Sequence, residues 1–215
     1  CTGPPPKLWV FATATAAVTT RPLLLGADIV FHSATKYLNG HSDVLAGVLV
    51  TRELNQRWSD VAMLRTKMGS PLPPLESWLL MRGLRTVFVR FRQCSANALA
   101  IARYLSEHPK VSWVNYPGLP GHPAYERATK YFRNGLYGAI LGFGIKGGLE
   151  GGRKFIESTK LFSHLANVGD AKSLVIHPAS TTHFRMDDAA LARASIGPGT
   201  IRLSIGLEDA DDLID

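Results

Sequence analysis

Residues 28–47 form the stretch that most restricts how this chain can fold. An uninterrupted apolar run, Ile29, Val30 and Phe31, predicts a strand with both faces covered, because a strand with one wet face would alternate with polar residues. Small hydroxyl residues end the run, and Lys36 follows just beyond its C-terminal end. In open α/β sheets, ligands collect at that edge. The stretch therefore predicts an α/β fold with a polar site around Lys36.

Strands and helices alternate along the rest of the chain. The predicted strands cover residues 45–51, 111–116 and 141–145, then 174–176 and a glycine-framed strand within 197–206. Predicted helices cover residues 53–65, 75–83, 124–132 and 149–158. We expect the strand at 45–51 to lie beside the strand that starts at Asp28. Such alternation favours an α/β architecture.

A long helix is predicted from Val87 to His108, because apolar side chains recur there at helical spacing and Pro109 ends the run. These side chains belong to Val87, Phe91, Cys94, Ala98, Ile101, Ala102 and Leu105. We interpret the helix as a bridge between two domains, 1–86 and 87–215. Cys94 on the apolar face is expected to be a core residue rather than a nucleophile.

Composition excludes several function classes. The 215 residues are 46% hydrophobic and 19% charged, as in an ordinary globular protein. The net charge of +7 is spread without a dense basic block, so we expect no nucleic-acid partner, although an anionic ligand would fit. Two distant cysteines and seven histidines without an HExxH pattern predict no disulfide framework and no metal site. No membrane-spanning run and no secretory signal are visible, so we predict a cytoplasmic protein with no membrane partner.

Lys36 lies close to two hydroxyl side chains, Ser33 and Thr35. A hydroxyl can donate a hydrogen bond to a phosphate oxygen, and a desolvated lysine amine can lose its proton and attack an aldehyde. Phosphate and aldehyde together describe pyridoxal phosphate (PLP). A lysine that follows a strand is more commonly a solvated surface residue. The chemistry of these residues alone leaves both interpretations open.

The segment SATKYLNGHSDVLAG, residues 33–47, resembles without gaps the cofactor-lysine signature of the Cys/Met-metabolism family of PLP enzymes. That family includes cystathionine γ-synthase, cystathionine lyases, methionine γ-lyase and the O-acyl-homoserine sulfhydrylases. The resemblance implies an aspartate-aminotransferase-like α/β fold (fold type I), with residues 1–86 in the PLP-binding large domain and 87–215 as the C-terminal small domain. It also implies PLP as the cofactor, Lys36 as the Schiff-base lysine, and Ser33 and Thr35 as phosphate ligands.

A second constellation lies near the C-terminus. The run KSLVIHPASTTH, residues 172–183, would be a turn rich in Ser and Thr on composition alone, but it resembles the family's C-terminal segment, in a context most similar to the O-acetylhomoserine sulfhydrylase branch. Arg202 shares a strand face with Ser204 and could hold a carboxylate through two parallel hydrogen bonds. A surface salt bridge is the alternative from the residues alone. The resemblance implies that Arg202 binds the substrate carboxylate, assisted by Ser173.

By this resemblance we expect an amino-acid substrate and a γ-replacement on O-acetyl- or O-succinylhomoserine that gives homocysteine or methionine. The protein is expected to be a homodimer or homotetramer whose subunits share sites. A cystathionine γ-synthase, or a cystathionine or methionine γ-lyase, is the alternative within the family, because the lysine turn looks more similar to those branches.

The N-terminal residues depart from the family pattern. The family places an aspartate at the pyridine nitrogen, but that place falls on Phe11 when counted back from Arg21, or on Leu8 when counted from residues 11–13. Neither side chain can hold the proton that makes the cofactor a strong electron sink. Further upstream family residues are also missing, so the chain looks like a C-terminal fragment. A catalytically inactive fragment or a structural subunit is therefore the alternative of another class.

Overall fold

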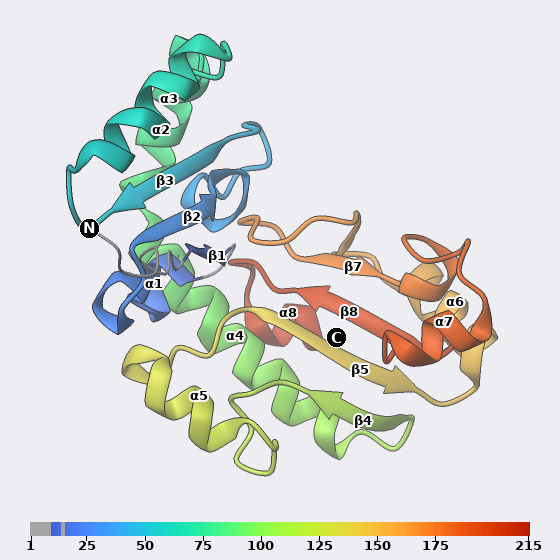
Figure 1. Ribbon diagram of the computed structural model, residues 1–215. Helices are drawn as coiled ribbons and strands as arrows, with labels where there is room; N and C mark the ends of the chain where they lie inside the picture. Colours follow the sequence, from blue (N-terminus) through green and yellow to red (C-terminus); the bar gives the residue numbers. More distant parts are fainter. Residues whose placement is uncertain (1–9, 14–15) are drawn as a thin grey trace. The chain divides into compact units, whose positions relative to one another are not determined.

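The computed structural model describes residues 10–13 and 16–215. The chain divides into two compact units, Cys1–Val87 and Phe88–Asp215 (Figure 1). Both units combine helices with a β-sheet. Their assignment to the large and small domains of a PLP enzyme stays a prediction.

The first unit contains a three-stranded sheet in the order β1-β2-β3. β1 (Val10–Thr13) runs parallel to β2 (Ile29–Ser33), and β3 (Gly47–Thr51) runs antiparallel to β2. The chain passes from β1 to β2 through α1 (Ala16–Thr19) and the 3₁₀ turn η1 (Pro22–Leu25). Ile29 and Val30 are buried. The predicted strand and its neighbour are therefore confirmed, but the predicted burial is wrong at Phe31, which is 40% exposed, so the strand is not covered along its whole apolar run.

Two helices follow β3. α2 (Gln56–Lys67) begins three residues later than predicted, because the Asn55 side chain caps it by accepting a hydrogen bond from the Trp58 amide at 3.1 Å. α3 (Pro74–Leu84) begins at a proline, which is well suited to the first helical position because its missing N–H would have no partner there.

α4 (Val87–Glu107) is the long helix predicted from apolar spacing. All seven apolar side chains of the predicted face are buried: Val87, Phe91, Cys94, Ala98, Ile101, Ala102 and Leu105. The helix ends before Pro109, whose ring cannot continue it. Its predicted core face is confirmed.

The second unit is built on a five-stranded sheet in the order β4-β5-β8-β7-β6. The strands are β4 (Val111–Asn115), β5 (Ile140–Ile145), β6 (Ser163–His164), β7 (Leu174–Ile176) and β8 (Thr200–Ser204). The helical elements are α5 (Tyr125–Tyr131), η3 (Arg133–Gly135), α6 (Gly148–Ser158), η4 (Pro178–Ser180), α7 (Asp188–Arg193) and α8 (Ala210–Ile214). Only β6 and β7 pair in parallel, whereas the other neighbours are antiparallel.

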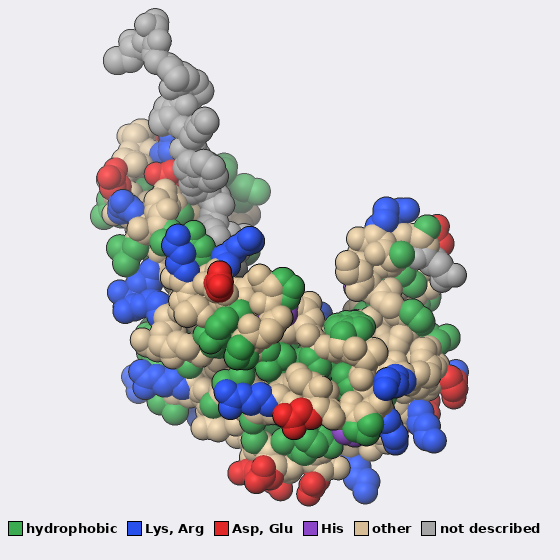
Figure 2. Space-filling view, turned by 90° about the horizontal axis from the view of Figure 1, so that it is seen from below, with side chains coloured by type: hydrophobic (Ala, Val, Ile, Leu, Met, Phe, Trp, Pro, Cys, Tyr) green, Lys and Arg blue, Asp and Glu red, His purple; other side chains and the backbone are tan. Residues whose placement is uncertain are grey.

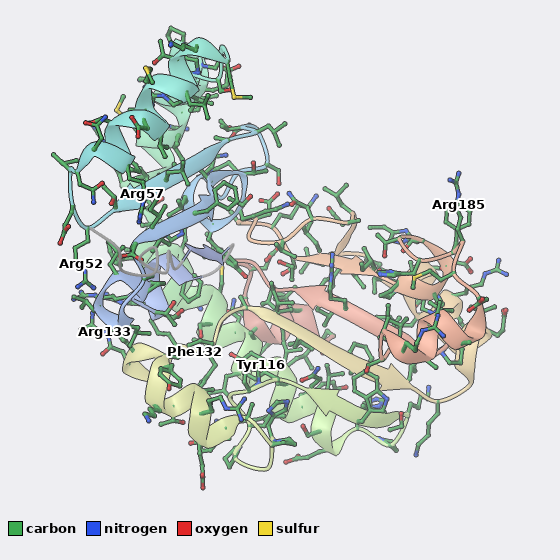
Figure 3. All side chains as sticks on the ribbon, viewed as in Figure 1. Arg52, Arg57, Tyr116, Phe132, Arg133 and Arg185 are labelled. Carbon is green, nitrogen blue, oxygen red and sulfur yellow. The ribbon has the colours of Figure 1, made fainter. Side chains whose placement is uncertain are left out.

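The core of the second unit lies where α4 passes along one face of this sheet (Figure 1). Alternate residues of the central strands are buried there, namely Leu141, Phe143, Ile201 and Leu203. Tyr116 ties the layers together, because its buried hydroxyl lies 2.8 Å from the carbonyl oxygen of Gly138 and 3.4 Å from that of Ser95 on α4 (Figure 3). The opposite face of β8 carries Arg202.

The surface has no single charged patch on the face shown in Figure 2, where lysine and arginine side chains are dispersed among uncharged ones. None of the helices in the described part of the chain has the length and apolar character that crossing a membrane requires.

Candidate active site

The predicted cofactor lysine lies in a tight turn at the end of β2. Residues Ala34–Leu38 form one π-helical turn, η2, in which Lys36 departs from helical geometry with φ −88° and ψ −133°. The amide of Asn39 donates to the Ala34 carbonyl at 3.0 Å, and the amide of Gly40 donates to the Lys36 carbonyl at 2.7 Å. The Lys36 side chain is half-buried. These two backbone hydrogen bonds thus fix the position of Lys36 at the end of the strand.

Thr35 is oriented by Ala46 across the turn. The Ala46 amide donates to Thr35 Oγ1 at 2.9 Å, and the Ala46 carbonyl accepts from the amides of Ala34 and Thr35 at 2.9 and 3.2 Å. The hydroxyl can donate one hydrogen bond, and it now donates to the same carbonyl at a longer distance of 3.3 Å. A phosphate oxygen could accept this hydrogen bond instead, while the amide of Ala46 keeps the hydroxyl in place.

Asn39 anchors the far side of the turn. Its side chain is buried and donates to Asp43 Oδ1 at 2.6 Å, and its carbonyl lies 2.7 Å from His41 Nδ1. Gly83 of α3 packs directly against it, since a Cβ at Gly83 would lie 2.4 Å from the Asn39 carbonyl oxygen. Sequence reasoning missed this support, because the two residues are distant along the chain and no short pattern connects them.

Arg202 lies in β8 with its side chain half-buried. Its Nη2 donates to the Asn167 carbonyl at 3.3 Å, and burial lowers the pKa of the guanidinium from its ordinary value. No carboxylate among residues 10–13 and 16–215 forms an ion pair with Arg202. A cavity of about 370 Å³ borders it, with Trp113, His183 and Ile196 in its lining. The surface salt bridge considered as an alternative is therefore not formed within the described chain.

Arg185, which lies between η4 and α7, differs from Arg202 in its exposure and its contacts. It is exposed, lies over the Phe184 ring at 5.3 Å and points away from the fold (Figure 3). Arg202 is thus the better placed of the two to receive an anion against the sheet.

Ser173 directly precedes β7 and is completely buried. Its hydroxyl donates to Glu208 Oε2 at 2.8 Å and accepts from the Gly206 amide at 2.8 Å. Both the donor and an acceptor site of this hydroxyl are used inside the protein. Sequence reasoning did not identify Glu208, which lies beyond the strand that carries Arg202.

Both ring nitrogens of His177 have hydrogen-bond partners inside the protein. Nε2 lies 2.6 Å from the Pro198 carbonyl oxygen and must donate to it, and Nδ1 lies 2.8 Å from Ser180 Oγ. The ring is buried. It fastens the turn after β7 to the segment that leads into β8.

The predicted site residues thus fall into two groups. The structure brings Ser33, Thr35 and Lys36 together in the first unit. It places Ser173 and Arg202 in the second unit, Ser173 directly before β7 and Arg202 in β8, the strand that pairs with β7. The relation between the two groups stays a prediction.

One of the two positions considered for the nitrogen-binding aspartate lies within the described residues. Phe11 lies in β1, paired with Val30 of β2. Leu8 lies outside the described residues. As for metals, the described residues contain no cluster of three or more His, Cys, Asp or Glu side chains that could hold an ion.

Comparison with known proteins assigns the family. The sequence profile of the family described as Cys/Met metabolism PLP-dependent enzyme matches residues 7–215. The chain belongs to this family. Family membership and the structural matches confirm the predicted type I fold of PLP-dependent enzymes.

Three relatives illustrate the similarity. An O-acetyl-L-homoserine sulfhydrylase of Thermus thermophilus is 40% identical over 90% of this chain and 53% of its own length. An L-methionine gamma-lyase of Pseudomonas deceptionensis is 44% identical over 90% of this chain and 48% of its own length. The crystal structure of a cystathionine gamma synthase from Xanthomonas oryzae pv. oryzae matches with a TM-score of 0.90 and 38% identity, over 97% of this chain and 54% of that chain. The chain spans about half the length of the relatives it matches.

Proposed function

We propose that this chain carries the cofactor lysine and the substrate-carboxylate arginine of a PLP-dependent enzyme of sulfur amino-acid metabolism. The observation that carries the proposal is the turn after β2, where Lys36 follows the strand end and the Ala46 amide holds the Thr35 hydroxyl, whose own hydrogen bond to the Ala46 carbonyl is long at 3.3 Å. The proposed reaction is an O-acetyl- or O-succinylhomoserine sulfhydrylase-like γ-replacement that gives homocysteine or methionine.

The residues of the lysine turn have distinct proposed roles. Ser33 and Thr35 donate hydrogen bonds to the cofactor phosphate, and Lys36 Nζ binds the cofactor's aldehyde carbon. In its free form, Nζ would move protons between substrate carbons, as a general base and then a general acid. PLP, when bound, supplies an electron sink for the charge that develops on the substrate.

Arg202 is proposed to hold the substrate carboxylate. A guanidinium matches a carboxylate with two parallel hydrogen bonds, which fixes the orientation of the amino acid as well as its position. The half-buried setting of Arg202 and its lack of an ion pair with any described carboxylate support this role. Ser173 is proposed to support the same site.

Two alternatives have their own support. Within the family, the lysine turn and the names of the relatives also fit a cystathionine γ-synthase, or a γ-lyase, in which elimination and hydrolysis by one water would give an oxoacid, ammonia and a thiol. Phe11 in β1, at a position considered for the nitrogen-binding aspartate, favours a catalytically inactive chain or a structural subunit.

We also propose a cytoplasmic homodimer or homotetramer in which neighbouring subunits complete each other's sites. This proposal rests on the family resemblance. Size-exclusion chromatography with light scattering, with and without PLP, would measure the oligomeric state directly.

Activity assays separate these functions. The PLP-loaded chain would be incubated with O-acetylhomoserine and sulfide, with O-succinylhomoserine and cysteine, and with methionine alone. Homocysteine from the first mixture supports the sulfhydrylase, cystathionine from the second supports the synthase, and oxoacid from the third supports the lyase. If no mixture reacts although PLP is bound at Lys36, the inactive alternative replaces the proposal.

A further inference from the structure

We propose that Glu208 is a positioning residue for the carboxylate site. By binding Ser173 it fixes the segment 165–173, and the Asn167 carbonyl of this segment accepts the hydrogen bond from Arg202. The proposal deepens the role proposed for Arg202 and rests on it.

The carboxylate of Glu208 receives two hydrogen bonds from a single residue. Ser173 donates its amide to Oε1 at 2.7 Å and its hydroxyl to Oε2 at 2.8 Å, and the Gly206 amide donates to the same hydroxyl at 2.8 Å. Hydrogen bonds to an ionised carboxylate are stronger than neutral ones. Because Ser173 is fully buried, loss of the carboxylate would leave a buried hydroxyl and amide without their acceptor.

Further contacts fasten the same two segments together. The amide of Leu207 donates to the Ala171 carbonyl at 2.8 Å, and the amide of Gly169 donates to Ser204 Oγ at 3.0 Å. The approach is so close that a Cβ on Gly206 would lie 2.4 Å from the Ala171 carbonyl oxygen. The segment before β7 is therefore docked on the segment after β8, and Glu208 supplies a charged acceptor to it.

The backbone around Glu208 is held in place by side chains of α4. Asn97 Nδ2 donates to the carbonyls of Glu208 and Gly206 at 2.7 and 3.2 Å, and Gln93 Nε2 donates to Asn97 Oδ1 at 2.7 Å. Asn97 is buried. The carboxylate therefore projects from backbone that the long helix holds in place, which is what a positioning residue needs.

The segment 165–173 contains no helix or strand, so its place depends on these tertiary hydrogen bonds. Its Asn167 carbonyl accepts from Arg202 Nη2 at 3.3 Å. Glu208 forms no ion pair with Arg202 among the described residues, so it acts on Arg202 through the segment and not through a direct charge contact. A displaced segment would let the guanidinium turn away from the direction in which it can hold a carboxylate.

The test compares four forms of the full chain loaded with PLP: the natural sequence, Glu208→Ala, Glu208→Gln and Glu150→Ala. Glu208→Gln keeps the side-chain size and one acceptor oxygen. Glu150 is an exposed carboxylate whose nearest cation, Arg153, lies at 4.0 Å, and serves as the matched control. Hydrogen–deuterium exchange of residues 165–176 should accelerate at least tenfold in Glu208→Ala, less in Glu208→Gln, and not in Glu150→Ala.

Ligand binding separates positioning from general loss of structure. L-norvaline and butylamine differ by the carboxylate alone, and neither carries a γ-leaving group. Glu208→Ala should weaken the binding of L-norvaline about tenfold and leave the binding of butylamine unchanged. Adding Arg202→Ala to Glu208→Ala should lower the affinity for L-norvaline little further, because both changes remove the same contact. Ser173→Ala is a second variant that should follow the same pattern.

Unchanged hydrogen–deuterium exchange of residues 165–176 in both Glu208 variants would overturn the proposal. Equal weakening of L-norvaline binding and butylamine binding would also overturn it. A chain that does not bind PLP overturns the proposed function instead. In that case the exchange experiment on the unloaded chain still decides whether Glu208 holds the segment.

Discussion

Thr35 and Ala46 are joined across the lysine turn by reciprocal contacts. The Ala46 amide donates to Thr35 Oγ1 at 2.9 Å, and the Thr35 amide donates to the Ala46 carbonyl at 3.2 Å. The side chain of Thr35 is thereby set by the backbone of the opposite strand end before any ligand arrives. A preset donor costs less entropy when a phosphate binds.

Thr35→Val should weaken PLP binding about tenfold, because it removes a hydrogen bond to a charged group at nearly constant volume. Thr35→Ser keeps the hydroxyl and should bind within about threefold of the natural chain. Absorption titration with PLP measures both. Thr66→Val, which changes an exposed threonine of α2, is the control. Equal affinity of Thr35→Val and the control would argue against the phosphate role.

Gly83→Ala should lower the free energy of unfolding by about 1–3 kcal/mol, because its new Cβ meets the Asn39 carbonyl and the backbone must shift. In an exposed helix the same change would stabilise by up to about 1 kcal/mol. Urea unfolding followed by circular dichroism measures the difference. Gly121→Ala, where nothing lies within 4 Å of the added Cβ, should be close to neutral. A stabilised Gly83→Ala chain would show that α3 does not brace the lysine turn.

Arg202→Ala should raise KM for an amino-acid substrate about 10- to 100-fold, since it removes a charge-assisted, bidentate contact. Arg202→Lys should recover only part of this loss, because an ammonium lacks the planar fork. Steady-state kinetics in the reaction that the chain is found to catalyse supply the test. Arg185→Ala, at an exposed cation between η4 and α7, should leave KM within about twofold. A similar KM for Arg202→Ala and Arg185→Ala would contradict the assignment.

Cys94 should resist thiol reagents in the folded chain. Burial raises the pKa of its thiol to about 12, so little thiolate exists at pH 8. In a Cys1→Ser background, labelling of Cys94 should proceed only at the rate at which the protein opens, and urea should accelerate it. Rapid labelling without denaturant would contradict the buried placement.

The same pKa shift predicts how stability depends on pH. The unfolded thiol ionises from about pH 9 while the folded thiol does not, so the free energy of unfolding should fall as pH rises from about 9 to about 12. Cys94→Ala should flatten this decline. The measurement is urea unfolding at a series of pH values, and identical slopes for the two chains would count against the shift.

Local patterns predicted much of this fold. The buried face of α4 follows directly from apolar spacing, since packing a helix against a sheet requires one continuous stripe. β2 and β3 follow from runs of strand-forming residues. Helix ends were less predictable, because a cap such as Asn55 is a single side chain that many sequences place in loops.

Long-range contacts were invisible in the sequence. Glu208 binds Ser173 across 35 positions, and neither residue type has a pattern that singles out the other. The packing of Gly83 on Asn39 is also a tertiary contact, and any small residue in a helix would look the same in the sequence. Candidate site residues could thus be predicted from a resemblance, whereas the residues that hold them in place required the structure.

The central claim is that Lys36 is the cofactor lysine. The most direct test incubates the purified chain with PLP, records the visible absorption band, reduces with borohydride and locates the labelled lysine by mass spectrometry. We predict a visible band and a label confined to Lys36, both absent from Lys36→Ala but present in Lys67→Ala, which changes an exposed lysine at the end of α2. Labels scattered over several lysines, with no band, would contradict the account.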